Sequence, residues 1–115
     1  LVFSSQVQAV ISWYGPMDQE ALLAPEDEFN LPRDLKNYWD LPGLVTEYMP
    51  PFLLLHGTAD TQVDYHTSEH FYEKLKEKGN ISELVLIEDA EHAGAPFVQD
   101  EVKNIILEFI RKNME

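Results

Sequence analysis

The chain has 115 residues, 44% of them hydrophobic, and a formal net charge of −13. This length predicts a single domain over residues 1–115, and the apolar content is that of a folded protein rather than a disordered tail. With 8 Lys and Arg against 21 Asp and Glu, the composition argues against binding to nucleic acids or anionic membranes. The absence of cysteine excludes disulfides, thiolate nucleophiles and Cys-bound zinc.

The sequence carries no targeting signal that could be recognised. No apolar run approaches the roughly 20 residues of a membrane helix, so we expect no membrane span. Residues 1–5 lack an initiator Met and the charged and apolar regions of a signal peptide. We interpret Leu1 as lying inside a longer protein. The lack of cysteine favours the cytoplasm, but a truncated N-terminus leaves the localisation open.

Three strands are predicted, separated by a long irregular segment and one helix. Residues 7–13 form a β-branched and aromatic run that ends at the turn signal Gly15-Pro16. Residues 17–50 show no sustained period and read as a cap-like excursion. The continuous apolar run 52–55, which ends in His56, is typical of a strand covered on both faces. The next strand is expected at 83–87.

Two helices complete the predicted fold. The first spans about 65–78 and ends at Gly79. The second spans about 96–112, and its apolar face carries Val98, Val102, Ile105, Ile106 and Phe109. Strands that alternate with helices predict an α/β fold, a parallel sheet with helices on both faces.

An acid and a histidine follow two of the predicted strands. Asp60 comes after the second strand and His92 after the third. Because functional groups collect at the carboxyl ends of parallel strands, we expect their loops to leave the same edge. A carboxylate that accepts a hydrogen bond from His Nδ1–H stabilises the imidazolium formed when Nε2 takes a proton. The order of these residues therefore favours an acid–base pair.

The segment Pro51–Val63, which contains His56-Gly57-Thr58-Ala59-Asp60, resembles the acid-bearing segment of α/β-hydrolases. The likeness is strongest to esterase/lipase-like and prolyl-oligopeptidase-like members. Glu91-His92-Ala93-Gly94 resembles their catalytic-histidine loop, and residues 7–18 look like the strand and turn two elements after the nucleophile. The resemblance covers nearly the whole chain. It implies the last three strands of that fold, Asp60 as the triad acid, His92 as the base, carboxylic esters as substrates, and no cofactor or metal.

The nucleophile of that family is missing from the chain. The Gly-x-Ser-x-Gly elbow precedes the acid and the histidine in these enzymes, and none of the serines present lies in such a motif: Ser4, Ser5, Ser12, Ser68 and Ser82. We therefore expect the C-terminal part of a serine ester hydrolase, inactive by itself. Neither the acyl group nor the choice between ester and peptide can be read from the sequence.

Five further residues are candidates for roles around the pair. His56 and Gly57 are expected to be structural, with the His56 ring holding the acid loop by hydrogen bonds. Trp13 and Tyr14, at the end of the first strand, and Trp39, in the excursion, are candidates for a substrate pocket. Packing in the core is the competing interpretation for each aromatic side chain.

Two alternatives to the hydrolase hypothesis come from other features. The open edge of strand 7–13 could pair with a second copy, which would make the chain a non-catalytic, self-associating domain. The sequence His66-x-x-Glu69-His70 fits the H-x-x-E-H pattern of zinc proteases, with Glu73 or Glu77 as a third ligand. A solvated helix surface is the simpler interpretation of the latter pattern.

Overall fold

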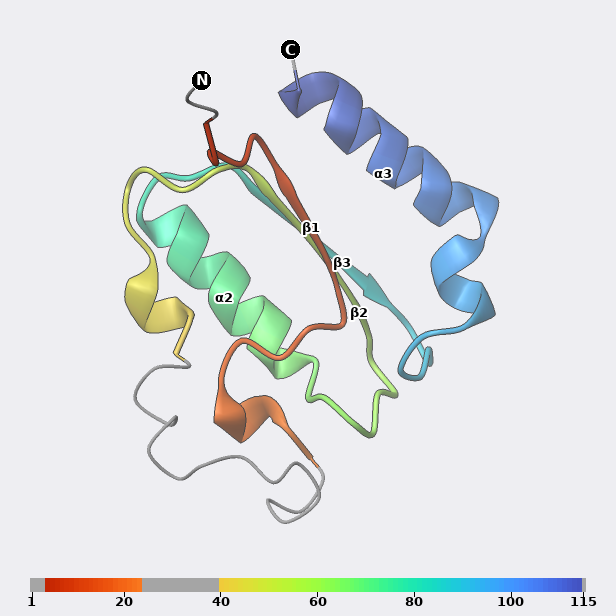
Figure 1. The fold of residues 1–115 in the computed structure, drawn as a ribbon. Helices are drawn as coiled ribbons and strands as arrows, with labels where there is room; N and C mark the ends of the chain where they lie inside the picture. Colours follow the sequence, from red (N-terminus) through yellow and green to blue (C-terminus); the bar gives the residue numbers. More distant parts are fainter. Residues whose placement is uncertain (1–3, 24–39, 115) are drawn as a thin grey trace.

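A three-stranded parallel sheet lies between two helices in the computed structural model, which describes residues 4–23 and 40–114 (Figure 1). The strands are β1 (Val10–Trp13), β2 (Phe52–Gly57) and β3 (Ser82–Ile87), in the spatial order β1-β2-β3. The central strand β2 pairs with both neighbours, so that Leu54 lies beside Ser12 on one side and Leu84 on the other. The predicted α/β class and parallel sheet are confirmed.

Each face of the sheet is covered by one helix, α2 (His66–Glu77) on one side and α3 (Asp100–Asn113) on the other (Figure 1). Leu54 packs with Phe71 and Leu75 of α2, whereas Leu53 and Leu55 join the cluster on the α3 side. Successive side chains of a strand point to opposite faces, so a central strand with two covered faces needs a continuous apolar run. Burial of each of these leucines contributes about 1.5–3 kcal/mol.

The helix predicted over 65–78 is confirmed to within one residue at each end. Gly79, at φ +81°, follows it, and its N–H donates to the carbonyl of Lys76. The single helix predicted from about residue 96 is wrong. A 3-10 turn, η4 (Ala95–Val98), comes first, and the extended backbone of Gln99 separates it from α3.

The break at Gln99 changes which side chain of η4 is buried. Phe97 is only 5% exposed and joins the core, whereas Val98, predicted on the apolar face, is 60% exposed. A continuous α-helix could not have turned Phe97 inward and kept the face of α3, which carries Val102 and Phe109, on the sheet. Core packing therefore outweighs the helical period at this end.

The strand predicted over 7–13 is shorter in the structure, where it begins at Val10. Of the excursion, residues 17–23 and 40–50 are described, with the 3-10 turns η1 (Gln19–Ala21) and η3 (Pro42–Leu44). Leu22 forms an isolated bridge with Val63, so this segment supports the loop after β2. Trp39 lies outside the described residues. In the described part, no helix has the length and apolar character needed to cross a membrane.

Candidate active site

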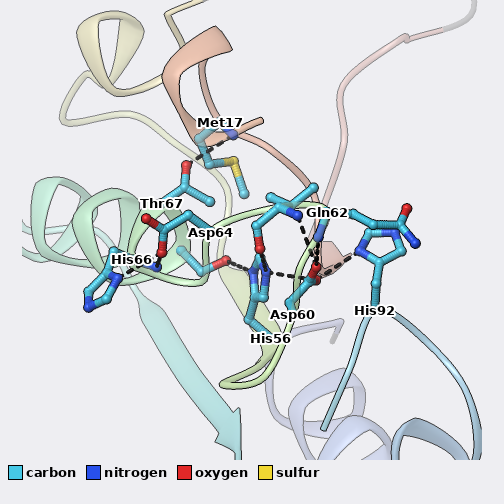
Figure 2. Close-up of polar contacts among 10 residues, drawn as sticks. Met17, His56, Asp60, Gln62, Asp64, His66, Thr67 and His92 are labelled. Atoms are coloured by element: carbon cyan, nitrogen blue, oxygen red, sulfur yellow. Dashed lines mark hydrogen bonds and ion pairs between the residues drawn. The ribbon is translucent and has the colours of Figure 1, made fainter. Parts of the chain in front are cut away.

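Asp60 and His92 lie side by side at the carboxyl edge of the sheet (Figure 2). Asp60 is on the loop that follows β2, and His92 is on the loop that follows β3. The distance from Asp60 Oδ2 to His92 Nδ1 is 2.8 Å. The Asp60 side chain is fully buried, while that of His92 is 24% exposed. The pair thus has a buried carboxylate and a histidine that solvent reaches.

The two loops are joined to each other by two hydrogen bonds, one to a side chain and one within the backbone. The N–H of Asp89 donates to Thr58 Oγ1 at 2.8 Å, and the N–H of Ala59 donates to the carbonyl of Ala90 at 2.9 Å. A Cβ built on Gly57 would collide with the carbonyl group of Ala90. Only glycine lets the loops approach so closely at this position.

The Asp60 carboxylate accepts hydrogen bonds from two backbone N–H groups as well as from His92. Oδ1 accepts from the backbone N–H groups of Gln62, at 2.8 Å, and Val63, at 2.9 Å. Burial by itself raises the pKa of this carboxyl, but the bonds from Val63, Gln62 and His92 outweigh burial and hold the pKa below 3.8. Asp60 is therefore ionised at neutral pH and fixed in orientation.

The His56 ring is completely buried behind Asp60. Nε2 lies 3.0 Å from the carbonyl oxygen of Val63 and 3.2 Å from Asp60 Oδ2, and Nδ1 lies 2.8 Å from Ser68 Oγ (Figure 2). Burial lowers the pKa of His56 below 6.5, against the opposing effect of the Val63 and Asp60 oxygens. The ring is thus neutral at neutral pH and contacts the acid loop at two points.

Ser68, which the sequence did not mark as a site residue, completes a Ser68–His56–Asp60 row. Although this order imitates a catalytic triad, Ser68 is 1% and His56 0% exposed. A nucleophile must reach its substrate, so this serine cannot serve as one. The sequence feature that could have marked Ser68 is its spacing from Phe71. It lies three residues before Phe71 and hence on the same, buried face of α2.

Tyr14 contacts the exposed side of the pair. Its ring centroid lies 4.5 Å from that of His92 and 4.8 Å from that of Phe97. Tyr14 has a left-handed backbone at φ 46°, and Ala93, next to His92, has φ 82°. Such conformations are uncommon for residues with a side chain and collect at functional sites.

An apolar cavity of about 360 Å³ opens beside Tyr14, lined by Trp13, Tyr14, Gly94, Phe97 and Val98. Trp13 remains 46% exposed, so packing does not account for its whole surface. The two aromatic residues expected near the pair therefore border one hollow next to His92.

The residues of the zinc pattern lie apart from this site, on α2. His66 and His70 are exposed, and His66 Nδ1 lies 2.7 Å from the carboxylate of Asp64, which also accepts the backbone N–H of His66. In residues 4–23 and 40–114, no three His, Asp or Glu side chains come close enough to hold a metal ion. The zinc hypothesis has no ligand set in this part of the chain.

His92 Nε2 has no hydrogen-bond partner among the residues that the structure describes. This nitrogen is the one that would exchange a proton with a nucleophile if Nδ1 is held by a carboxylate. The arrangement can orient a histidine and stabilise its charged form. A nucleophile and donors for an oxyanion are the further parts that ester hydrolysis requires.

Solved structures of esterases share this fold. A truncated carbohydrate esterase from gut microbiota superposes with a TM-score of 0.79 at 19% identity, over 96% of this chain and 44% of that chain. The bifunctional GH43-CE protein of Bacteroides eggerthii has a TM-score of 0.77 at 27% identity, over 96% of this chain and 16% of that chain. The butyrate-bound esterase of the planctomycete Thermogutta terrifontis has a TM-score of 0.70 at 26% identity, over 95% of this chain and 45% of that chain.

The chain spans less than half the length of each of these proteins. No curated protein sequence matches it. The fold is that of a partial α/β-hydrolase that resembles carboxylesterases, as the sequence predicted. The sequence model of the prolyl oligopeptidase family matches residues 4–115, which is nearly the entire chain. The chain therefore belongs to the prolyl oligopeptidase family.

Proposed function

We propose that this chain supplies the acid, Asp60, and the base, His92, of a serine hydrolase that acts on carboxylic esters. The observation that carries the proposal is the 2.8 Å contact between Asp60 Oδ2 and His92 Nδ1 at the carboxyl edge of the sheet. The buried carboxylate fixes the tautomer of His92, so that Nε2 faces outward without its proton. The chain alone lacks the nucleophile and is inactive.

In the assembled site, His92 Nε2 takes the proton of a serine hydroxyl as that oxygen attacks the ester carbonyl. His92 then returns the proton to the leaving alcohol. Asp60 remains ionised and stabilises the imidazolium, for which the bonds from Gln62 and Val63 prepare it. These donors also keep the carboxylate from rotating away between the two proton transfers.

The nucleophile would come from polypeptide that lies along β1. That strand lies at one edge of the sheet, in the order β1-β2-β3, so its outer backbone groups face no strand of the described part. The resemblance of residues 7–18 to the segment that follows the nucleophile points to the same edge. A strand placed there would end near Tyr14 and hence near His92.

The cavity next to His92 favours, as the substrate, an ester that carries an apolar group. Its lining includes Trp13 and Tyr14 from the end of β1 and Phe97 from η4. Apolar walls with a few polar groups at one side are typical of small-molecule sites. The Thermogutta terrifontis esterase, 26% identical to this chain, has a structure with butyrate bound. We propose short-chain acyl esters as the substrate class.

A chimera tests the proposal directly. Residues 1–115 would replace the matching 45% of the Thermogutta terrifontis esterase chain. We expect hydrolysis of p-nitrophenyl butyrate, with a loss in kcat of about 10⁴-fold on Asp60→Asn and of about 10⁶-fold on His92→Ala. His70→Ala, which removes an exposed histidine of α2, is the control. A folded chimera whose activity survives His92→Ala would contradict the proposal.

The isolated chain provides a second, independent measurement. Short-chain nitrophenyl esters should show no saturable hydrolysis with residues 1–115 alone. Saturable turnover that disappears in His92→Ala would reveal a nucleophile within this chain and refute the part of the proposal that places it elsewhere.

Self-association is a second candidate function, favoured by the terminal position of β1 and the exposure of Trp13 at its end. A second copy could pair with the open edge of β1. In that case the chain would be a non-catalytic domain. Light scattering at increasing concentration decides the question, since a strictly monomeric chain rules this candidate out.

A further inference from the structure

The hydrogen bonds behind Asp60 define the tautomer of His56. Its Nε2 lies 3.0 Å from the Val63 carbonyl oxygen and 3.2 Å from Asp60 Oδ2. A carbonyl oxygen and an ionised carboxylate only accept hydrogen bonds, so Nε2 must carry the hydrogen. The ring is neutral because it is buried. Nδ1 therefore has a free lone pair and needs a donor.

The donor to Nδ1 is the hydroxyl of Ser68, at 2.8 Å. A hydroxyl can donate or accept, but a neutral ring with its hydrogen on Nε2 leaves Ser68 only the role of donor. We propose that Ser68 is a positioning residue for the Asp60–His92 pair, because it commits His56 to present Nε2–H to the Val63 carbonyl and to Asp60 Oδ2 beside it. This role rests on the proposed function, whereas the chain of hydrogen bonds does not.

The consequence for the pair follows from the oxygen that is shared. Asp60 Oδ2 accepts His92 Nδ1–H at 2.8 Å and lies 3.2 Å from His56 Nε2, while Oδ1 accepts two backbone N–H groups. If Ser68 is lost, Nδ1 of His56 becomes a buried acceptor without a donor, which costs about 1–3 kcal/mol. The His56 ring then rotates, or a water molecule enters beside Nδ1, and the contact between Nε2 and Asp60 Oδ2 weakens. Ser68 would thus act on His92 through two intervening side chains.

The neighbouring Thr67 provides a matched control. Like Ser68 it is a buried hydroxyl on the first turn of α2, but its Oγ1 accepts the backbone N–H of Met17 at 3.2 Å (Figure 2). Thr67→Val therefore removes a buried hydrogen bond of the same helix without touching His56. A general loss of stability should be common to Thr67→Val and Ser68→Ala, whereas an effect on Asp60 should be specific to Ser68→Ala.

The first measurement needs no variant. Nitrogen-15 NMR of the 115-residue chain should show His56 as the neutral tautomer with its hydrogen on Nε2 at neutral pH. A hydrogen on Nδ1, or an imidazolium at neutral pH, would overturn the inference. This result stands even if Ser68→Ala proves too unstable to study.

The second measurement follows the Asp60 carboxyl carbon by NMR during an acid titration. Donors favour the ionised carboxylate, so we expect the Asp60 midpoint to move to higher pH in Ser68→Ala and to stay at the wild-type value in Thr67→Val. Equal midpoints in wild type and Ser68→Ala would overturn the inference. Neither measurement uses turnover, so they can succeed even where the chimera shows that the proposed ester hydrolysis is wrong.

Within an active chimera, the role can also be separated from stability. Ser68→Ala should lower kcat more than Thr67→Val does, with KM for p-nitrophenyl butyrate unchanged, because the buried Ser68 side chain is out of reach of a substrate. If kcat fell equally in the two variants, Ser68 would be a residue of general stability and the positioning role would be refuted.

Discussion

Gly57 lies so close to Ala90 that no side chain fits between them: a Cβ on Gly57 would overlap the carbonyl group of Ala90 and come within 2.8 Å of the carbonyl oxygen of Glu91. Both obstacles are backbone atoms, which cannot rotate away. This contact brings the loop after β2 against the loop after β3. The spacing between Asp60 and His92 thus depends on a glycine that touches neither side chain.

Gly57→Ala should therefore separate the two loops as well as destabilise the fold. We expect a loss of about 1–3 kcal/mol in the free energy of unfolding, typical of an overpacked core, measured by urea titration. Gly79→Ala is the control: it has open space around its Cβ but a φ of +81°, so it should cost about 1–2 kcal/mol through backbone strain alone. Only Gly57→Ala should alter the NMR signals of His92, and unchanged signals would contradict this role of Gly57.

Thr58→Val tests the second link between the same loops. The variant keeps the shape of the side chain but removes the Oγ1 that accepts the N–H of Asp89. We expect a loss of about 1 kcal/mol and faster hydrogen exchange at the amide of Asp89. The exposed Thr61→Val is the control and should change stability by less than about 0.5 kcal/mol. Protection of Asp89 that matches wild type would show that the bond contributes nothing to the link.

The sheet could be predicted from the sequence because its central strand has an unusual pattern. Leu53, Leu54 and Leu55 leave no polar face, and only a strand covered on both sides satisfies such a run. The positions of Asp60 and His92 follow from the same fact, since parallel strands place their carboxyl ends at one edge. The contact between Asp60 and His92 is therefore a consequence of the strand order that the sequence predicts.

Long-range packing accounts for what the sequence could not predict. The role of Ser68 depends on how α2 is rotated against β2, which places its hydroxyl on the His56 ring. The left-handed backbone of Tyr14 and the break at Gln99 both serve the contact between Tyr14 and Phe97. Local periodicity does not contain these relations, because they join residues far apart in the chain.

Because of the break at Gln99, we expect very different losses of stability when two adjacent residues are truncated. Phe97→Ala should cost about 3–5 kcal/mol, because Phe97 is 5% exposed and contacts the ring of Tyr14. Val98→Ala, at a position that is 60% exposed, should change stability by less than about 0.5 kcal/mol. A continuous helix with Val98 on its apolar face would give the larger loss at Val98. Urea titrations of the two variants distinguish the two arrangements.

The pH dependence of stability should report His56 and Asp60 separately. The pKa of His56 in the folded chain is lowered from 6.5 by burial. Between that lowered value and 6.5 the unfolded chain binds a proton that the folded chain does not, so stability falls as the pH drops through this window. The pKa of Asp60 lies below 3.8, where the hydrogen bonds from Val63, Gln62 and His92 outweigh burial. Its contribution is present above 3.8 and is lost as the pH falls through the folded value.

Variants at the two positions test these windows, because each replaces one titrating side chain by an amide that carries no charge at any pH. Relative to His56→Gln, the free energy of unfolding of the wild type should decline as the pH drops below 6.5. Relative to Asp60→Asn, it should decline as the pH drops below 3.8. Parallel curves for wild type and His56→Gln across the first window would mean that the His56 ring takes up a proton as readily in the folded chain as in the unfolded one. Such a ring could not be the neutral ring that accepts a hydrogen bond from Ser68 at Nδ1.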